Sequence, residues 1–265
     1  NAVEAIVSSY KRNKTDIRKV LLASEALFRF KKTDEAFEIL NSIKPDSKLP
    51  KRYWQLLLLG YKQQQNENKI LSTLEQWRET HPYHIEPSIL LVEHFTTKRD
   101  YTRAISVVNQ AFEYHPDDST LQLVKMQLLL NTKELYQAKE LYRVIEKREI
   151  KKSLKMGLEG RILLLEENFE QAIPKLNSFY QAYPSAQNAL YLVSAYQGNK
   201  DDSNAVKVLE VFLKDNNNDR VRVILASLYL NTDKDKALQN YEKISKTQSN
   251  SVVVNNNLAW LYMEK

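Results

Sequence analysis

The feature that most constrains this chain is the recurrence of small or apolar residues at a fixed interval of 34 residues. They stand at Ala2, Ala36, Ile70, Ala104, Ala138, Ala172 and Val206. Self-similarity at a period of this size indicates a stack of supersecondary units, each of which buries its apolar face only against its neighbours. The chain is therefore expected to form an extended array of equal units.

Each period contains two amphipathic helices joined by a turn. Ala36 is followed by Leu40 and Ile43, and equivalent residues follow the other positions, which is the i, i+4, i+7 stripe of an α-helix. A second stripe begins about twelve residues earlier, at Ser24, Leu58, Val92, Met126 and Gly160. Polar turn segments separate the stripes at 31–34, 66–68, 98–100, 132–134 and 166–168. The unit is thus helix, tight turn, helix.

Prolines mark the ends of the units. Pro82, Pro116 and Pro184 each follow a second-helix stripe, and proline ends a helix because it lacks an N–H and disfavours α conformation in the preceding residue. Residues 117–119, with the sequence Asp-Asp-Ser, and Ser185 are expected to cap the helices that follow.

A period of 34 residues with a small residue in each helix and a closing proline resembles the tetratricopeptide repeat. The best copy runs from Ile85 to Pro116 and carries Phe95, Ala104 and Ala111 at the family's spacing. Leu58 and Met126 depart from the pattern, and the register near Ala205 and Val206 is ambiguous by one residue. The resemblance implies an all-α fold, a right-handed superhelical solenoid of antiparallel helix pairs with about seven repeats.

We expect one solenoid over residues 1–265, as a fragment of a longer repeat protein, because neither end resembles a capping repeat. The expected units are 1–16 (partial), 17–50, 51–84, 85–118, 119–152, 153–185, 186–218, 219–251 and 252–265 (partial).

Composition narrows the classes of partner. The net charge is +6, but 39 Lys and Arg are interspersed with 33 Asp and Glu, and the densest basic cluster, 147–155, still contains Glu149. Nucleic-acid binders usually gather positive charge on one element, so the pattern favours a protein or peptide partner over nucleic acid.

No run approaches the roughly 20 apolar residues of a transmembrane helix. No cysteine is present, which excludes disulfides and thiolate metal sites.

No motif for catalysis or cofactor binding occurs. The sequence has no P-loop, G-x-G-x-x-G or G-x-S-x-G string, and its 4 glycines cannot build a phosphate cradle. Among the histidines, His81 and His84 could touch, but Pro82 between them favours a loop pair over a metal site. Gly157 and Gly160 are interpreted as close helix-packing positions. We therefore predict no enzyme activity, no cofactor and no metal.

In the tetratricopeptide family the first helices line a concave groove. The resemblance implies that positions on these helices that do not serve packing contact the partner. They are Arg18, Leu21, Glu25, Phe28, Arg52, Gln55, Leu59, Lys62, Glu86, Ile89, Glu93, Gln127, Arg161 and Tyr191. The Lys and Asn pattern of repeats that bind the acidic tail of heat-shock chaperones is missing, since Leu21, Gln55, Ile89, Leu123 and Gly157 stand in its place.

The functional hypothesis is a non-catalytic scaffold that holds a peptide or protein in this groove. The string from Asn256 to Tyr262 is similar to a phrase of bacterial cell-envelope repeat proteins, including lipoproteins of exopolysaccharide and exosortase (PEP-CTERM) systems. It favours the periplasmic side of a bacterial envelope, with any targeting signal outside this sequence. Two alternatives stay open: a helical-repeat RNA-binding protein, and the repeat region of a larger enzyme.

Overall fold

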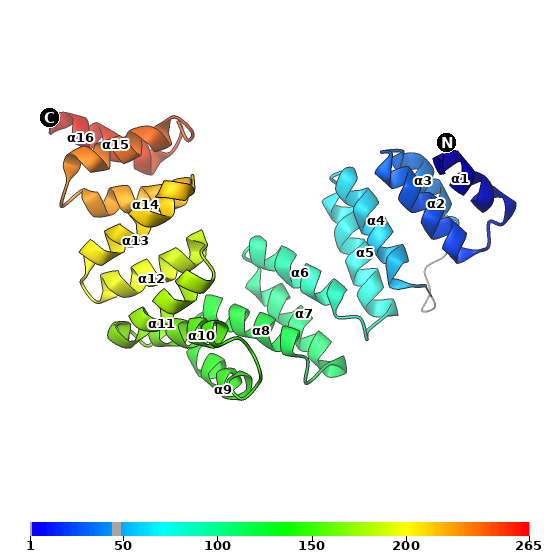
Figure 1. Ribbon diagram of the computed structural model, residues 1–265, viewed down its shortest axis with the longest axis horizontal. Helices are drawn as coiled ribbons and strands as arrows, with labels where there is room; N and C mark the ends of the chain where they lie inside the picture. Colours follow the sequence, from blue (N-terminus) through cyan, green and yellow to red (C-terminus); the bar gives the residue numbers. More distant parts are fainter. Residues whose placement is uncertain (1, 44–48, 265) are drawn as a thin grey trace. The chain divides into compact units, whose positions relative to one another are not determined.

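The computed structural model describes residues 2–43 and 49–264, with the side chain of Ala2 outside the described part. Within these ranges the regular secondary structure is sixteen helices (Figure 1). They are α1 (Ala2–Arg12), α2 (Ile17–Arg29), α3 (Thr33–Leu40), α4 (Lys51–Gln63), α5 (Glu67–Thr80), α6 (Glu86–Thr97), α7 (Tyr101–Tyr114), α8 (Ser119–Asn131), α9 (Leu135–Ile145), α10 (Lys152–Leu165), α11 (Phe169–Ala182), α12 (Ala186–Gly198), α13 (Asp202–Asp215), α14 (Asp219–Tyr229), α15 (Lys234–Ser245) and α16 (Val252–Met263).

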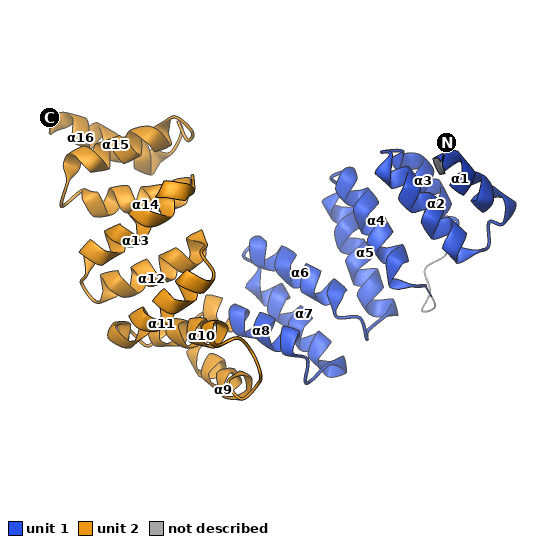
Figure 2. Cartoon of the chain, in the orientation of Figure 1, with its two compact units in different colours: residues 1–128 blue, residues 129–265 orange. Residues whose placement is uncertain are grey.

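These helices pack as consecutive pairs, so the predicted all-α repeat fold is confirmed. Close packing joins α2 with α3, α4 with α5, α6 with α7, α10 with α11, α12 with α13 and α14 with α15, and the sixteen described helices correspond to about eight pairs. The first helices of neighbouring hairpins also touch, as α2 with α4 and α10 with α12. The chain divides into two compact units, residues 1–128 and 129–265 (Figure 2), which are described separately below.

The hairpin turns share one backbone geometry. Six of them contain a non-glycine residue with a positive φ between 54° and 61°. These residues are Lys31, Gln65, Arg99, Lys133, Glu167 and Lys200. The residue after each donates its backbone N–H to the carbonyl five positions earlier at 2.8–2.9 Å, for example Asn66 to Tyr61. This bond is the 6→1 bond of the Schellman motif, which ends the first helix and satisfies one of its free carbonyls.

The same residue then begins the second helix. The side chains of Asn66, Asp100 and Asp201 each accept a hydrogen bond at 3.1 Å from the backbone N–H three residues later. The predicted caps form in the same way, since Asp118 accepts from the N–H of Leu121 at 2.9 Å and Ser185 from that of Asn188 at 3.2 Å. Local hydrogen bonds therefore fix both the end of one helix and the start of the next.

The turn geometry predicts that Gln65→Gly stabilises the chain by roughly 0.5–1 kcal/mol, because glycine adopts positive φ without the steric cost that a side chain incurs. Gln64→Gly is the matched control, since Gln64 is an exposed glutamine at φ −81°. The control should destabilise by a similar amount. Urea unfolding followed by circular dichroism measures both changes, and equal signs for the two variants would contradict the explanation.

The spacing of the turns resolves the register near Ala205. The interval shortens from 34 to 33 residues between Glu167 and Lys200, which makes Ala205 the equivalent of Ala172. Both alanines are fully buried, whereas Val206, which the even spacing selected, is only half-buried. The period of the sequence is therefore one residue shorter at this point.

The glycines of the first helices admit large side chains from neighbouring helices. A Cβ at Gly157 would lie 2.4 Å from Cγ of Phe179, and one at Gly160 would lie 2.9 Å from Cγ of Leu176. This agrees with the interpretation of both glycines as close-packing positions. Gly60 plays the same part in unit 1, where its Cβ would meet the rings of Phe28 and Phe37 at 2.5 Å.

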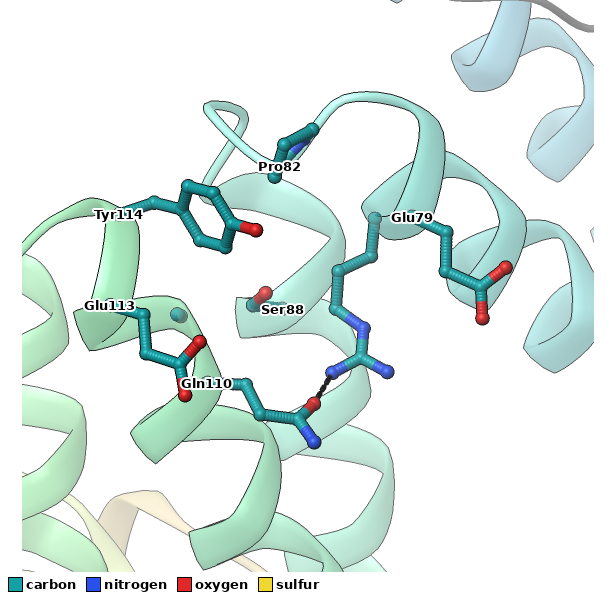
Figure 3. Close-up of a pocket in the computed structure, with 8 residues that line it drawn as sticks. Glu79, Pro82, Ser88, Gln110, Glu113 and Tyr114 are labelled. Carbon is teal, nitrogen blue, oxygen red and sulfur yellow. Dashed lines mark hydrogen bonds between the residues drawn. The ribbon is translucent and has the colours of Figure 1, made fainter.

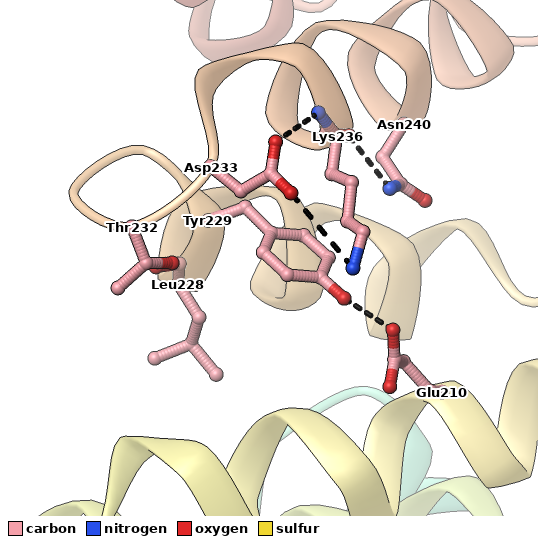
Figure 4. A network of polar contacts seen from close by, with 7 residues as sticks. All are labelled: Glu210, Leu228, Tyr229, Thr232, Asp233, Lys236 and Asn240. Atoms are coloured by element: carbon pink, nitrogen blue, oxygen red, sulfur yellow. Dashed lines mark hydrogen bonds and ion pairs between the residues drawn. The ribbon is translucent and has the colours of Figure 1, made fainter.

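A polar network joins α13, α14 and α15 in unit 2 (Figure 4). The buried Tyr229 donates its hydroxyl hydrogen bond to Glu210, and the Lys236 ammonium lies 5.1 Å from the centre of the Tyr229 ring. Asp233 accepts from the backbone N–H of Lys236 at 3.0 Å. Burial, followed by the hydrogen bond to Glu210, raises the pKa of Tyr229, so the phenol stays a neutral donor. The network fixes three successive helices against one another.

Candidate functional site

A groove in unit 1 gathers six of the fourteen residues predicted to contact a partner. It has a volume of ≈ 480 Å³ and lies between the first helices α4 and α6, with Trp77 of α5 at its base. The predicted residues that line it are Arg52, Gln55, Leu59, Lys62, Glu86 and Ile89. Lys51, Leu56, Leu58 and Leu90 complete the lining. We call this site the α4–α6 groove.

Helical spacing accounts for this convergence. On α4 the predicted residues are separated by three or four positions, and on α6 Ile89 follows Glu86 by three, so each set forms one helix face. An adjoining depression of ≈ 320 Å³ shares Leu58, Lys62 and Leu90 with the groove and adds the predicted residue Glu93. The site thus continues along the two first helices.

The groove has an apolar floor and a charged rim. Arg52 forms an ion pair with Glu25 of α2 at 2.7 Å, and Lys51 pairs with Glu86. The hydrogen bond from Arg52 is the main reason that the pKa of Glu25 is lowered. Burial raises the pKa of Glu86, but the hydrogen bonds from Lys51 and from the backbone of Glu86, together with the nearby positive charges, outweigh it, and the net shift is downward.

Lys62 is the basic residue of the groove whose ammonium group is available to a partner. It is exposed, lines both depressions, and has no ion pair or side-chain hydrogen bond with the described residues. Leu59, one turn earlier on α4, is 38% exposed in spite of its large apolar side chain. An apolar contact next to a free ammonium is an arrangement suited to an amphipathic peptide with a carboxylate.

Two predicted contact residues on α2 belong to the core instead. Leu21 is 9% exposed and Phe28 is fully buried, so the expectation that they face outward is wrong. The Phe28 ring lies edge to face with Phe37 at 5.4 Å and occupies the space that Gly60 leaves free. Sequence reasoning missed this because the space depends on a glycine in the next repeat.

Arg161 and Tyr191 in unit 2 contact each other. Arg161 is 5% exposed, its guanidinium lies 4.5 Å from the centre of the Tyr191 ring, and it donates to Asn131 at 3.0 Å. Burial lowers the pKa of Arg161. The expected outward orientation is therefore wrong for Arg161, which connects α10 to α12, while Tyr191 is half-buried. Arg18, Gln127 and Glu93 are exposed, as expected.

The histidines His81 and His84 form a stacked pair beside the groove, with ring centres 5.0 Å apart. Nδ1 of His84 accepts a hydrogen bond from the indole N–H of Trp77 at 2.9 Å, and Nε2 of His81 lies 3.0 Å from the carbonyl of Leu49. In the described part of the chain no three His, Cys, Asp or Glu residues are grouped as metal ligands would be. The pair is a packing element of the α5–α6 loop.

This pair predicts a loss of stability in mild acid. Burial, followed by the charge of His81, lowers the pKa of His84 below its ordinary 6.5, with Glu86 opposing and Lys51 reinforcing the shift. The unfolded chain then binds more protons than the folded chain, so the stabilisation is complete above pH ~6.5 and is lost as the pH falls toward the folded-state pKa. The free energy of unfolding should be lower at pH 5.5 than at pH 7.5, and the difference should shrink in His84→Gln. An unchanged difference in that variant would exclude His84 as its source.

Comparison with known proteins shows the fold. Neither a protein-family model nor a curated protein matches the chain. Among solved structures, a chain of the APC/C hetero-tetramer Cut9–Hcn1 aligns with a TM-score of 0.66 and 14% identity over 98% of this chain and 52% of that one. A tetratricopeptide repeat protein from Parabacteroides merdae aligns with a TM-score of 0.65 and 12% identity over 98% of both chains. Yeast Tom70 aligns with a TM-score of 0.59 and 11% identity over 99% of this chain and 57% of the Tom70 chain.

These likenesses establish the tetratricopeptide-repeat fold. The chain spans about half the length of the Cut9–Hcn1 chain that it matches. None of the helices described is both long and apolar enough to cross a bilayer.

Proposed function

We propose that this tetratricopeptide-repeat chain is a non-catalytic scaffold that binds a peptide or protein segment in the α4–α6 groove. The observation that carries the proposal is the convergence of six predicted contact residues on one depression with an apolar floor. The segment would place an apolar side chain against Leu59 and Ile89 and a carboxylate near Lys62. Support also comes from the Cut9–Hcn1 structure, in which a chain of the same fold is part of a protein assembly.

We further propose that the scaffold works on the periplasmic side of a bacterial envelope, in an exopolysaccharide or exosortase assembly. The similarity of the string from Asn256 to Tyr262 to envelope repeat proteins supports this. The test is fractionation of source cells that express the full-length natural gene product. Recovery with the periplasmic or membrane fraction is expected, and recovery with the cytoplasm alone would refute the location without affecting the groove.

Site-specific photocrosslinking tests the groove. A benzoylphenylalanine residue replaces Leu59, and the matched control replaces Leu22, which is 58% exposed on α2 and outside the groove lining. In source cells, position 59 should give discrete protein adducts that position 22 does not give. Lys62→Glu in the same chain should reduce them at least fivefold. RNA adducts at position 59 would support the RNA-binding alternative, and identical adducts at both positions would refute the groove.

A further inference from the structure

A second cavity in unit 1 lies between the second helices α5 and α7 and has a volume of ≈ 400 Å³ (Figure 3). It contains none of the residues predicted from the sequence to contact a partner. Its lining consists of Arg78, Glu79, Pro82, Ser88, Gln110, Ala111, Glu113 and Tyr114. The cavity is distinct from the α4–α6 groove, since the two share no lining residue.

The charge that the cavity offers to a ligand is negative. Glu79 and Glu113 are exposed and form no ion pair with any described residue. The one cation of the lining, Arg78, is already engaged, because its guanidinium contacts Glu75 at 2.5 Å and donates to Gln110. Two carboxylates are therefore available to a ligand, whereas the positive charge is neutralised within the protein.

Ser88 contributes a hydroxyl group to the lining of the cavity. It is only 2% exposed, and its hydroxyl makes no hydrogen bond with the part of the chain that the structure describes. Figure 3 shows this hydroxyl facing the space bounded by Pro82, Gln110 and Tyr114. Because the hydroxyl opens onto the cavity, it can accept a hydrogen bond from an N–H donor of a ligand.

Aromatic rings stand at the mouth of the cavity. Tyr114 is 47% exposed, and Tyr83, which is 74% exposed, lies edge to face with it at 5.6 Å. An exposed tyrosine face next to free carboxylates attracts a cation. Large exposed aromatic side chains are also enriched where proteins bind partners.

The cavity is not a requirement of repeat packing. One period of 34 residues later, Phe112, Gln122 and Val144 stand in place of Arg78, Ser88 and Gln110. If the fold itself demanded all three polar groups, all three would recur at the equivalent positions. The combination of arginine, serine and glutamine therefore does not recur one period later, where Gln122 is the polar residue among the three.

We infer that this cavity binds an arginine or lysine side chain of a basic peptide. The cation lies against Tyr114 and near the carboxylate of Glu113, while one of its N–H groups donates to the hydroxyl of Ser88. This site is additional to the α4–α6 groove, whose free side chain is the cation Lys62. The two sites therefore differ in the charge of the partner that they select.

Titration of the whole 265-residue chain with short peptides tests the inference through backbone amide NMR shifts. The probe is acetyl-Gly-Arg-Arg-Gly-amide, and its neutral analogue carries citrulline at both arginines. The arginine peptide should shift the amides of Ser88, Gln110 and Glu113, with at least tenfold tighter binding than the citrulline peptide. Glu113→Gln should weaken the arginine peptide at least fivefold.

Glu38→Gln is the matched control, because Glu38 is an exposed acid on α3 that no described residue pairs with and that lies outside the cavity. It should leave the affinity unchanged. Equal affinity for both peptides, or equal weakening by both substitutions, would overturn the inference, since either result indicates diffuse attraction to surface acids. Shifts on α4 without shifts at Gln110 and Glu113 would place the peptide in the other groove and equally refute it. All outcomes are independent of the crosslinking at position 59.

Discussion

Trp54→Ala should lower the free energy of unfolding of unit 1 by about 3 kcal/mol or more, within the range for removal of a large buried side chain. Trp54 is fully buried, stacks on Trp77 with ring centres 6.3 Å apart, and contacts Tyr53 edge to face at 5.3 Å. Its indole N–H has no hydrogen-bond partner among the described residues. The substitution also removes this unpaired buried N–H, which offsets part of the lost free energy of unfolding. The lower end of the ~3–5 kcal/mol range is therefore expected.

Trp260→Ala is the control for this substitution. Trp260 is 42% exposed and lies beneath the Lys234 ammonium at 5.1 Å, so its removal should cost at most about 1 kcal/mol. Urea unfolding gives the two free energies. Because repeats interact mainly with their neighbours, hydrogen exchange should accelerate around α4 and α5 and remain unchanged around α14 and α15. Similar losses for the two variants would show that burial at Trp54 does not decide the effect.

Gly157→Leu should destabilise unit 2 by about 3 kcal/mol, at the upper end for overpacking of a core. The first carbon of the new side chain would lie 2.4 Å from Cγ of Phe179, an atom close to its own backbone that cannot move far. Leucine has a higher helix propensity than glycine, which offsets less than about 1 kcal/mol of the strain. Thermal and urea unfolding of the purified chain measure the net effect.

A second substitution identifies the source of that strain. Phe179→Ala alone should destabilise, but combined with Gly157→Leu it should raise stability above that of Gly157→Leu, because the new side chain then enters the space of the lost ring. Lys152→Leu, at an exposed position of the same helix, should change stability by less than about 0.5 kcal/mol. Strictly additive effects of the two substitutions would show that Phe179 is not the residue in conflict.

Local patterns made the helices predictable. The i, i+4, i+7 stripes, the turn segments and the prolines depend on residues close in sequence, and the observed helices begin and end at these signals. Pro82, for example, follows α5 by two residues. The caps at Asp118 and Ser185 were equally local. The α4–α6 groove followed from the same periodicity, because equivalent first-helix positions in neighbouring repeats must lie side by side.

Contacts between repeats were not predictable from one repeat. Leu21, Phe28 and Arg161 occupy positions that a single helix would present to solvent, and a neighbouring repeat buries them. The cavity between α5 and α7 was not predicted, because the resemblance to the tetratricopeptide repeat places the partner on the first helices. A signal existed in Glu79 and Glu113, which stand one period apart at equivalent positions with tyrosines close in sequence.

The pairing of glycines with phenylalanines limits how the hairpins can be rearranged. Phe28 and Phe37 of one hairpin need the bare backbone at Gly60 of the next. The position 34 residues after Gly60 is His94, so excision of residues 51–84 would preserve the period yet confront both rings with an imidazole. The hairpins are thus similar in length but not interchangeable, and engineered deletion or shuffling of whole repeats must keep each ring with its own glycine.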